Sequence, residues 1–583
     1  MNSTPLGYNM FNDSIYRTGS NDEPDLFIIT DLKSSGFWLQ EKKVSEVDYN
    51  NFLYDATQYP DPYVSSLSDI KGLLKQVIDS AIISPNLIRI KNEDIVFDVL
   101  GLSRYLRNTT KGKKPKDDAE ACLNGIFLQT FLRYSGIYAE ILSQFELSEN
   151  DANLIRNSKC KVFAISTTFV PDWSKVKKVS QFIKKYCPEA IIIVGGPLAF
   201  LLKISVDKES RNKIVSSLSG LVNAIITEEN GELSLLCILQ NIFSGNAIDQ
   251  IPGMISPIKN DVYFYNNSDT CHLNTHFIDW SNVFLPENIN TVAIETSRGC
   301  MFKCKYCSYS KFHAYKENPL ELLRKEIRSL KGKEGVKYIS FVDGTLNGNS
   351  KRILDICKIL IEEKLNIPWH FMGNVKGLSK QQAMLLAESG CEFANIGIES
   401  GSNKLRQLMG KPIENNQQII ESFQNLHDSG VISRGFFFVG FPGETEDTVQ
   451  ETIDLINSMP IDLFRVAIFR PRMNSYIVEN NMKYSLEGRG YLWRHYSMDS
   501  VEAAKCVKEI FLQTKPKYDP NRGVYELMME GYSRNTAFQI NEMKNKLSQK
   551  VNNGIFSEAQ KGSYDRLFKR LKNTVNEFDP SSS

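Results

Sequence analysis

Short, almost wholly apolar segments alternate with longer charged segments along most of this chain, and this alternation limits the folds open to it. For example, "KVFAIST" (161–167) and "AIIIVGGP" (190–197) flank the amphipathic stretch "WSKVKKVSQFIKKY" (173–186). Strands that are apolar on both faces are typical of parallel sheets covered by helices on both sides. Residues 91–255 are therefore predicted to form a doubly wound α/β domain.

A second series of the same kind starts at "TVAIETSRGC". Charged helical segments separate its predicted strands, which are 336–344, 367–375, 392–400, 433–441 and 461–469. Repeated βα units of this length indicate a barrel or partial barrel, here over residues 289–489. Residues 490–583 are predicted to be helical, residues 256–288 to be a linker, and residues 1–90 to be an N-terminal segment without an assigned role.

Charge and hydropathy indicate which partners and which cellular compartment to expect. The net charge is +1 and no long block carries one sign, so no nucleic-acid partner is expected. The N-terminus lacks the apolar core of a secretory signal, and the apolar runs are too short to cross a membrane. A cytoplasmic protein without a membrane is expected, and its eleven cysteines are then mostly reduced.

Three of these cysteines lie close together in a Cys-x₃-Cys-x₂-Cys run, namely Cys300, Cys304 and Cys307. A structural zinc site needs four protein ligands, so His313 would have to be the fourth. A ferredoxin-type cluster also needs a fourth cysteine, and the next one downstream, Cys357, lies in a helix-like segment. A [4Fe–4S] cluster held by three cysteines leaves one iron free for a substrate or cofactor. Unrelated thiols are the remaining alternative.

This run, placed directly after a barrel-like strand, resembles the radical S-adenosylmethionine superfamily over roughly residues 290–490. The resemblance implies that S-adenosylmethionine chelates the free iron and is split into methionine and a 5′-deoxyadenosyl radical. It also implies that the backbone of Tyr306 meets the adenine. A reductant such as flavodoxin or ferredoxin would supply the electron.

Later segments resemble the same superfamily and imply further contacts to S-adenosylmethionine. "NIGIESGS" resembles the ribose-binding strand end, with Glu399 and Ser400, although Glu399 as a helix cap is the alternative. "FVDGTLNGN" places Asp343 near the methionine amine, or at a helix cap. "GFFFVGFPGET" (435–445) places Gly440 against the adenosine, and Arg434, directly before it, is expected to contact the carboxylate or to be an exposed structural arginine.

The order of the two domains resembles the cobalamin-binding subgroup of this superfamily. The resemblance places the cofactor at three turns of the first domain, which contain Ser166, Thr167, Gly195, Gly196, Gly231 and Glu232. All six histidines lie at or after His272, so a cobalamin bound here would lack a histidine of this domain on cobalt. The alternative is that this domain is empty or serves another purpose.

The sequence therefore predicts an α/β enzyme with a Rossmann-like cobalamin-binding-type domain, a partial TIM-like barrel and a helical C-terminal region. The resemblance implies cobalamin-dependent radical methylation of an unactivated carbon, with a peptide or a small natural product as substrate. Two alternatives stay open: a radical rearrangement, cyclisation, epimerisation or bond cleavage without methyl transfer, and a non-catalytic sensor or scaffold.

Overall fold

The structure is a computed structural model that describes residues 23–30, 67–107 and 123–577, together with β1 (Ile15–Tyr16) and β3 (Lys42–Lys43). Short gaps inside these ranges lie at 91–92, 97, 143–144, 169, 171, 205, 207, 249–250, 252, 258–260, 264–276, 286–288, 414, 473, 521–522 and 555–556. Much of the predicted N-terminal segment and the middle of the predicted linker therefore lie outside the described residues.

The first domain is built on an eight-stranded sheet with the order β1-β6-β2-β7-β8-β9-β10-β11. Its central strands are parallel: β6 (Ala139–Leu142), β2 (Leu26–Ile29), β7 (Val162–Ser166), β8 (Ile191–Gly195) and β9 (Ala224–Ile226). The hairpin of β10 (Met254–Ser256) and β11 (Asp261–Tyr263) continues the sheet antiparallel. The predicted linker thus begins with an edge strand of this domain.

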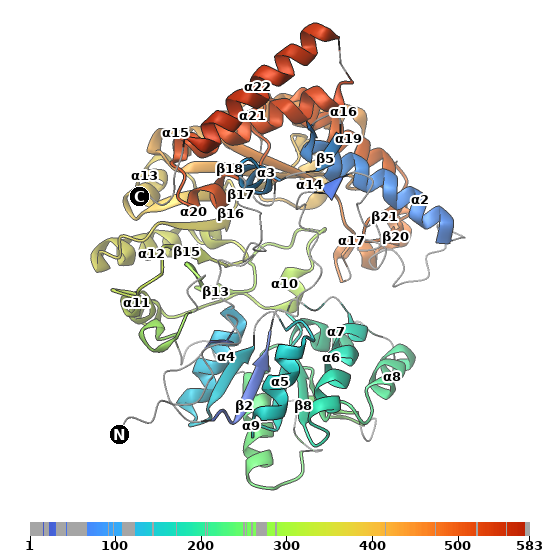
Figure 1. Ribbon diagram of the computed structural model, residues 1–583, viewed down its shortest axis with the longest axis vertical. Coiled ribbons are helices and arrows are strands. Elements are labelled where there is room, and N and C mark those ends of the chain that lie inside the picture. The colour runs from blue at the N-terminus through green and yellow to red at the C-terminus, as the bar shows by residue number, and fades with distance from the viewer. Residues whose placement is uncertain are drawn as a thin grey trace.

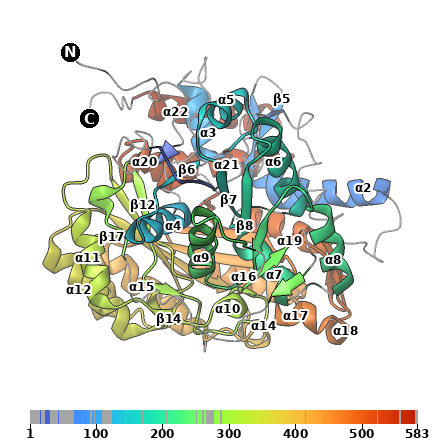
Figure 2. The ribbon, with the colours of Figure 1, turned by 90° about the horizontal axis from the view of Figure 1, so that it is seen from below.

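Helices cover both faces of this sheet, as the apolar strands predict. One face packs against α4 (Leu123–Tyr134) and α9 (Glu232–Phe243). The other packs against α5 (Glu149–Asn157), α6 (Trp173–Tyr186), α7 (Pro197–Ile204) and α8 (Lys208–Ser217). The two helix layers lie on opposite sides of β7 and β8 (Figure 2). The alternation is visible in β7, where Phe163 and Ile165 join one core and Val162 and Ala164 the other.

The second domain is a six-stranded parallel sheet in sequence order. Its strands are β12 (Thr291–Ile294), β15 (Tyr338–Phe341), β16 (Trp369–Gly373), β17 (Cys391–Glu399), β18 (Ile432–Val439) and β19 (Leu463–Ile468). Helices α11 (Leu320–Ser329), α12 (Ser350–Glu363), α13 (Lys380–Glu388), α14 (Asn403–Met409), α15 (Asn416–Ser429) and α16 (Glu446–Ser458) connect them. This is the predicted partial barrel, and the predicted fold class is confirmed.

The chain after the barrel is helical, with one exception. A small sheet of β20 (Glu487–Arg489), β21 (Leu492–His495) and β22 (Met498–Asp499) precedes α19 (Ser500–Gln513). The remaining helices are α20 (Val524–Met529), α21 (Arg534–Asn552) and α22 (Glu558–Asn576), and they close the amino end of the barrel. In Figure 1 they lie above the barrel, with the Rossmann-like domain below it.

Two segments pack differently from their predicted domain assignment. β2, from the N-terminal segment, lies in the middle of the Rossmann-like sheet between β6 and β7. By contrast, β5 (Glu93–Val96) and α3 (Val99–Leu106), which were assigned to the Rossmann-like domain, pack against α20 and α21. Their apolar side chains fill the amino end of the barrel, a contact that local periodicity cannot reveal. Among the described residues, no helix combines the length and apolar character needed to span a membrane.

Candidate functional site

The loop after β12, residues 295–318, carries the three clustered cysteines, and we call it the cysteine loop. Its base is closed by β13 (Ser297–Arg298) pairing with β14 (Lys316–Glu317), and by Asn318, whose side-chain amide donates to the Glu295 carbonyl at 2.6 Å. A Cβ on Gly299 would lie 2.6 Å from the His313 carbonyl oxygen, so glycine is required where the two sides of the loop meet. The cysteines are therefore presented by a pinned loop at the carboxyl edge of the barrel.

The three thiols are partly buried. Cys300 Sγ lies 3.6 Å from Thr345 Oγ1, and the Tyr309 amide donates to Cys307 Sγ at 3.4 Å. Burial raises the pKa of the Cys304 and Cys307 thiols, and the positive charge of bound iron would stabilise both thiolates. Among the described residues, no three His, Cys, Asp or Glu side chains form a group that could hold a metal ion. In a four-iron cluster each cysteine binds a different iron, so its thiols are spread apart.

Tyr306 and Glu399, both predicted to contact S-adenosylmethionine, meet directly. The Tyr306 hydroxyl donates to Glu399 Oε1 at 2.9 Å, and the Tyr306 ring packs edge-on against Phe438 at 5.0 Å. Glu399 is the last residue of β17 and has a φ of 74°, in the left-handed region that a non-glycine residue rarely adopts. Such strain at the carboxyl end of a barrel strand is a mark of a functional position.

Lys411, which our sequence reasoning missed, completes this group. Its Nζ lies 2.9 Å from Glu399 Oε1, and its side chain is only 7% exposed. Burial alone would lower the pKa of Lys411, but the carboxylate of Glu399 and the thiol of Cys304 raise it above its usual value. A buried ammonium thus lies between the cysteine loop and the strand end that was predicted to hold ribose. The loop after α14 carries no periodic signal that could have identified it.

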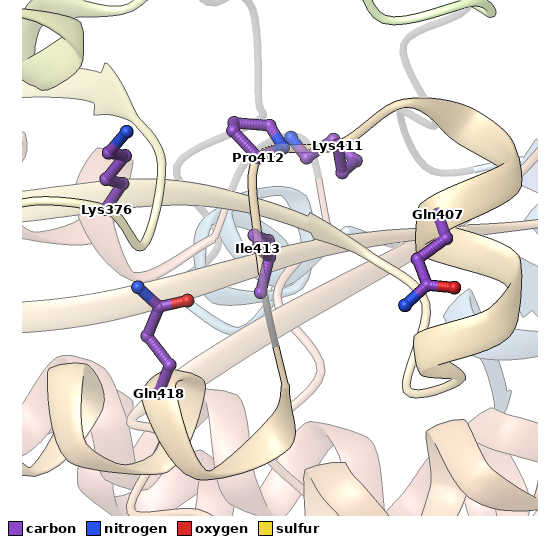
Figure 3. Close-up of a pocket in the computed structure, with 6 residues that line it drawn as sticks. All are labelled: Lys376, Gln407, Lys411, Pro412, Ile413 and Gln418. Carbon is purple, nitrogen blue, oxygen red and sulfur yellow. The ribbon is translucent and has the colours of Figure 1, made fainter.

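Lys411 also lines a pocket of about 310 Å³ that opens to solvent. Figure 3 shows the pocket around the Lys411–Ile413 segment, with Gln407 on α14, Gln418 on α15 and Lys376 after β16. The Lys305 amide donates to the Met409 carbonyl at 2.9 Å, which fixes this end of α14 against the cysteine loop.

The structure places Arg434 away from this edge, contrary to our prediction of a contact with the cofactor carboxylate. Arg434 is the third residue of β18, near its amino end, and forms an ion pair with the fully buried Asp519 at 2.5 Å. Its guanidinium also lies over the Phe393 ring at 5.3 Å. Arg434 therefore ties the C-terminal region into the amino end of the barrel, which is a structural role, although the side chain is largely buried and the alternative that we named was an exposed arginine.

Asp343 lies at the carboxyl edge as predicted, but its carboxylate already has partners and is only 1% exposed. It accepts hydrogen bonds from the Thr296 amide at 3.1 Å, from Thr296 Oγ1 at 2.8 Å and from Ser297 Oγ. Asp343 thus holds the base of the cysteine loop, where a cofactor amine cannot reach it. It is not the helix cap either, because Asn349 caps α12.

Ser400 and Gly440 also serve the protein framework. Ser400 is 1% exposed, and its Oγ accepts from the Ser402 amide at 3.1 Å. Gly440 is buried with a φ of 103°, and a Cβ there would lie 2.4 Å from Cη2 of Trp493. The space beside Gly440 is therefore filled by Trp493 from β21, a strand that we did not predict, and neither residue is open to an adenosine.

The carboxyl edge of the Rossmann-like sheet contains the other predicted cofactor residues. Thr167 Oγ1 donates to the Gly195 carbonyl at 2.8 Å and accepts from the Leu198 amide at 3.1 Å, so it fixes the turn after β8. Gly196 is exposed and has a φ of 100°. Ser166 Oγ accepts from Asn124 Nδ2 at 2.6 Å. The part of this edge that stays open comprises Thr168, Gly196 and Pro197, which are all exposed.

The turn after β9, with Gly231 and Glu232, contacts the cysteine loop. Arg298 Nη1 lies 2.8 Å from Asn230 Oδ1 and 3.3 Å from Glu232 Oε1, and its Nη2 lies 3.0 Å from Glu295 Oε2. Although burial opposes the charge, Glu295 and Glu232 raise the pKa of Arg298. His313 Nδ1 lies 3.0 Å from Glu229 Oε1. The predicted cofactor role of Glu232 is thus replaced by an ion pair that joins the two domains.

Gly231 is required for packing inside the domain, because a Cβ there would lie 2.8 Å from Cγ2 of Ile226. The Rossmann-like edge and the cysteine loop meet at this turn, so the ligand-binding edges of the two domains lie next to each other. This arrangement could not be derived from the sequence, because contacts between residues of different domains leave no local pattern in it.

Comparison with known proteins gives one family and several relatives. A model of the Radical SAM superfamily matches residues 294–456. A protein of Pyrococcus horikoshii, named an uncharacterized methyltransferase, is 25% identical over 359 residues, which are 58% of this chain and 76% of that protein. The anaerobic magnesium-protoporphyrin IX monomethyl ester cyclase of Rubrivivax gelatinosus is 22% identical over 323 residues, 52% of this chain and 56% of that protein.

Among solved structures, the cobalamin-dependent S-adenosylmethionine radical enzyme OxsB, with aqua-cobalamin and S-adenosylmethionine bound, is similar with a TM-score of 0.51. The sequences are 17% identical, and the similarity covers 79% of this chain and 74% of OxsB. This similarity concerns the arrangement of the Rossmann-like domain and the partial barrel.

The matched region runs from the end of β12 into α16, and therefore includes all three cysteines, Tyr306, Glu399 and Lys411. The family match thus covers the same part of the barrel that brings these residues together. Residues 294–456 are accordingly a domain of the radical S-adenosylmethionine superfamily.

Proposed function

We propose that this enzyme is a cobalamin-dependent radical methyltransferase acting on an unactivated carbon of a peptide or small-molecule substrate. The [4Fe–4S] cluster with S-adenosylmethionine would supply the 5′-deoxyadenosyl radical, and cobalamin would supply the methyl group. The observation that supports this most is the turn at 229–232, which joins the open carboxyl edge of the Rossmann-like sheet to the cysteine loop.

Residues of the barrel edge would hold S-adenosylmethionine. Glu399 accepts the ribose hydroxyls, because a carboxylate can accept two hydrogen bonds at once. Tyr306 fixes the orientation of Glu399 through its hydroxyl. Lys411 takes the role that we had assigned to Arg434 and holds the carboxylate of the methionine moiety, since it is the buried cation beside Glu399 and Cys304.

Cobalamin would lie on the open edge of the Rossmann-like sheet. Thr168, Gly196 and Pro197 are exposed there, and ligands of open α/β sheets bind outside the carboxyl ends of the strands. Residues 1–271 contain no histidine, so the domain offers no imidazole for the lower face of cobalt. With the cofactor's own dimethylbenzimidazole also detached from cobalt, a spectrum of the cob(II)alamin form without nitrogen splitting is expected.

Thr168→Trp is expected to weaken cobalamin binding at least about tenfold, because the indole would occupy the open edge. Gly196 is a poorer target, because its φ of 100° makes any side chain there strain the turn itself. The measurement is an absorbance titration of cobalamin into the anaerobically reconstituted protein. Ser216→Trp, on the exposed end of α8, is the matched control and should bind as the unaltered protein does.

Methyl transfer is tested in the same preparations without knowledge of the substrate. With methyl-labelled S-adenosylmethionine and a reductant, the unaltered protein should form labelled methylcobalamin and release S-adenosylhomocysteine, whereas Thr168→Trp should not. Failure to bind any cobalamin would contradict the proposal. The function would then fall to a rearrangement, cyclisation or epimerisation, whose product shows no gain of a methyl mass.

A further inference from the structure

The surface beside the cysteine loop carries an excess of positive charge. The residues are Lys303, Lys305, Lys376 and Lys404, which together with the pocket in Figure 3 we call the lysine surface. Lys303 and Lys305 flank Cys304 in the sequence. A Cβ on Gly410, at the end of α14, would lie 3.7 Å from the Lys303 carbonyl oxygen and 3.9 Å from Cγ of Lys305. The lysine surface is therefore continuous from the cysteine loop to α14.

α14 and the pocket extend this surface. Lys404 and Gln407 are three residues apart on α14 and lie on one face of the helix, and Gln407 lines the pocket together with Lys376 and Lys411. Leu408 is 39% exposed beside them. A polar surface with an exposed apolar side chain is suited to a transient protein contact.

The charge of this surface is not balanced locally. Within the described part of the chain, Lys303, Lys305, Lys376 and Lys404 have no ion-pair partner, and the side chain of Lys305 contacts the Tyr476 ring at 5.7 Å. Lys411, which lines the pocket, is paired with Glu399, and the nearby Lys311 is paired with Glu479. Because the whole chain has a net charge of only +1, the excess at this surface reflects where the lysines lie.

The lysine surface and the Rossmann-like domain contact different parts of the cysteine loop. Arg298 and His313, at either end of the loop, contact the Rossmann-like domain. The middle of the loop, at Cys304, contacts α14 through the Lys305 amide instead. A cluster on these cysteines would thus face the Rossmann-like domain on one side and the lysine surface on the other.

We propose that the lysine surface is the docking site for an acidic protein that delivers single electrons to the cluster, of the flavodoxin or ferredoxin class. This inference rests on the proposed radical chemistry, which consumes one electron for each S-adenosylmethionine cleaved. The donor loses one electron, the cluster gains it, and no bond forms or breaks in the transfer. Opposite charge steers such partners together and raises the rate of encounter.

Charge reversal at Lys376 and Lys404 tests the proposal with flavodoxin as the probe. Both side chains are exposed, and glutamate near the start of α14 suits the helix dipole, so the double variant K376E/K404E should fold. We expect flavodoxin to bind about tenfold or more weakly and to reduce the cluster more slowly by a similar factor. In the unaltered protein, the affinity for flavodoxin and the rate of cluster reduction should both fall as ionic strength rises. Lys358→Glu, on the exposed side of α12, is the matched control.

Reduction by dithionite separates this proposal from the function on which it rests. A small reductant needs no docking surface, so it should reduce the cluster equally in all three proteins. Flavodoxin binding and reduction that survive the charge reversal would overturn the surface alone. A protein that assembles no reducible cluster would refute the proposed function, and the docking site with it. RNA binding lost in the double variant, with unchanged flavodoxin kinetics, would also overturn the proposal and assign the surface to nucleic acid.

Discussion

Replacement of Cys300, Cys304 and Cys307 together by alanine is expected to remove all cluster iron, the brown colour of the anaerobic protein and every trace of S-adenosylmethionine cleavage. The three thiols are the ligands that the Cys-x₃-Cys-x₂-Cys run offers to a cluster, and the base of the loop is held independently by Asp343 and Asn318. The loop should therefore keep its fold while losing the cluster. Iron and sulfide analysis, with the electron paramagnetic resonance signal of the reduced protein, measures the loss.

The matched control for this variant is Cys237→Ala, which removes an exposed thiol on α9 in the Rossmann-like domain. It should keep the full iron content and the rate of S-adenosylmethionine cleavage. Full iron content in the triple alanine variant would mean that the cluster, if any, is held elsewhere. The assignment of the barrel edge as the catalytic site would then be wrong.

The barrel strands could be predicted because the apolar residues within each short segment indicate that the segment is buried. "EFANIGIES" is apolar on both faces, and the observed strand, β17, starts at Cys391 and ends at Glu399. The same reasoning located α6 and α19, whose apolar spacing matches one buried helix face. The small sheet β20–β22 was missed because its strands are short and carry few apolar residues.

The partners of side chains could not be predicted in this way. Asp343 and Arg434 both lie on strands that we identified, yet Asp343 is bound by Thr296 and Arg434 by Asp519, which come from distant parts of the chain. The sequence therefore indicated which residues lie on the barrel strands, but not which of them stay open to a ligand. Lys411 shows the converse, since its importance arises only from the contact with Glu399 across the loop after α14.

Lys411→Met is expected to lower the affinity for S-adenosylmethionine by roughly a hundredfold while leaving the cluster in place. The change removes the buried cation that we assign to the methionine carboxylate, and hydrogen bonds to charged groups contribute roughly 1.5–3 kcal/mol each. It also leaves Glu399 without its ion-pair partner, so the carboxylate that should accept the ribose hydroxyls loses its fixed position. Lys411→Arg keeps the charge and should recover part of the affinity.

The measurement is equilibrium dialysis of S-adenosylmethionine against the reconstituted protein, with iron content as the check on the cluster. Glu399→Ala should weaken binding by roughly tenfold to over a hundredfold, because it removes the ribose contact. Tyr306→Phe should have a smaller effect, since it removes only the hydroxyl that orients Glu399.

The double variant Arg434→Met with Asp519→Asn provides the decisive comparison. It removes the ion pair at the amino end of the barrel without leaving either charge buried alone, so the fold should persist. Its affinity for S-adenosylmethionine should equal that of the unaltered protein, because Arg434 lies away from the carboxyl edge. Normal affinity in Lys411→Met combined with a loss in the Arg434 variant would reverse the assignment. The carboxylate of the cofactor would then be held from inside the barrel, and Glu399 and Lys411 would form a structural pair.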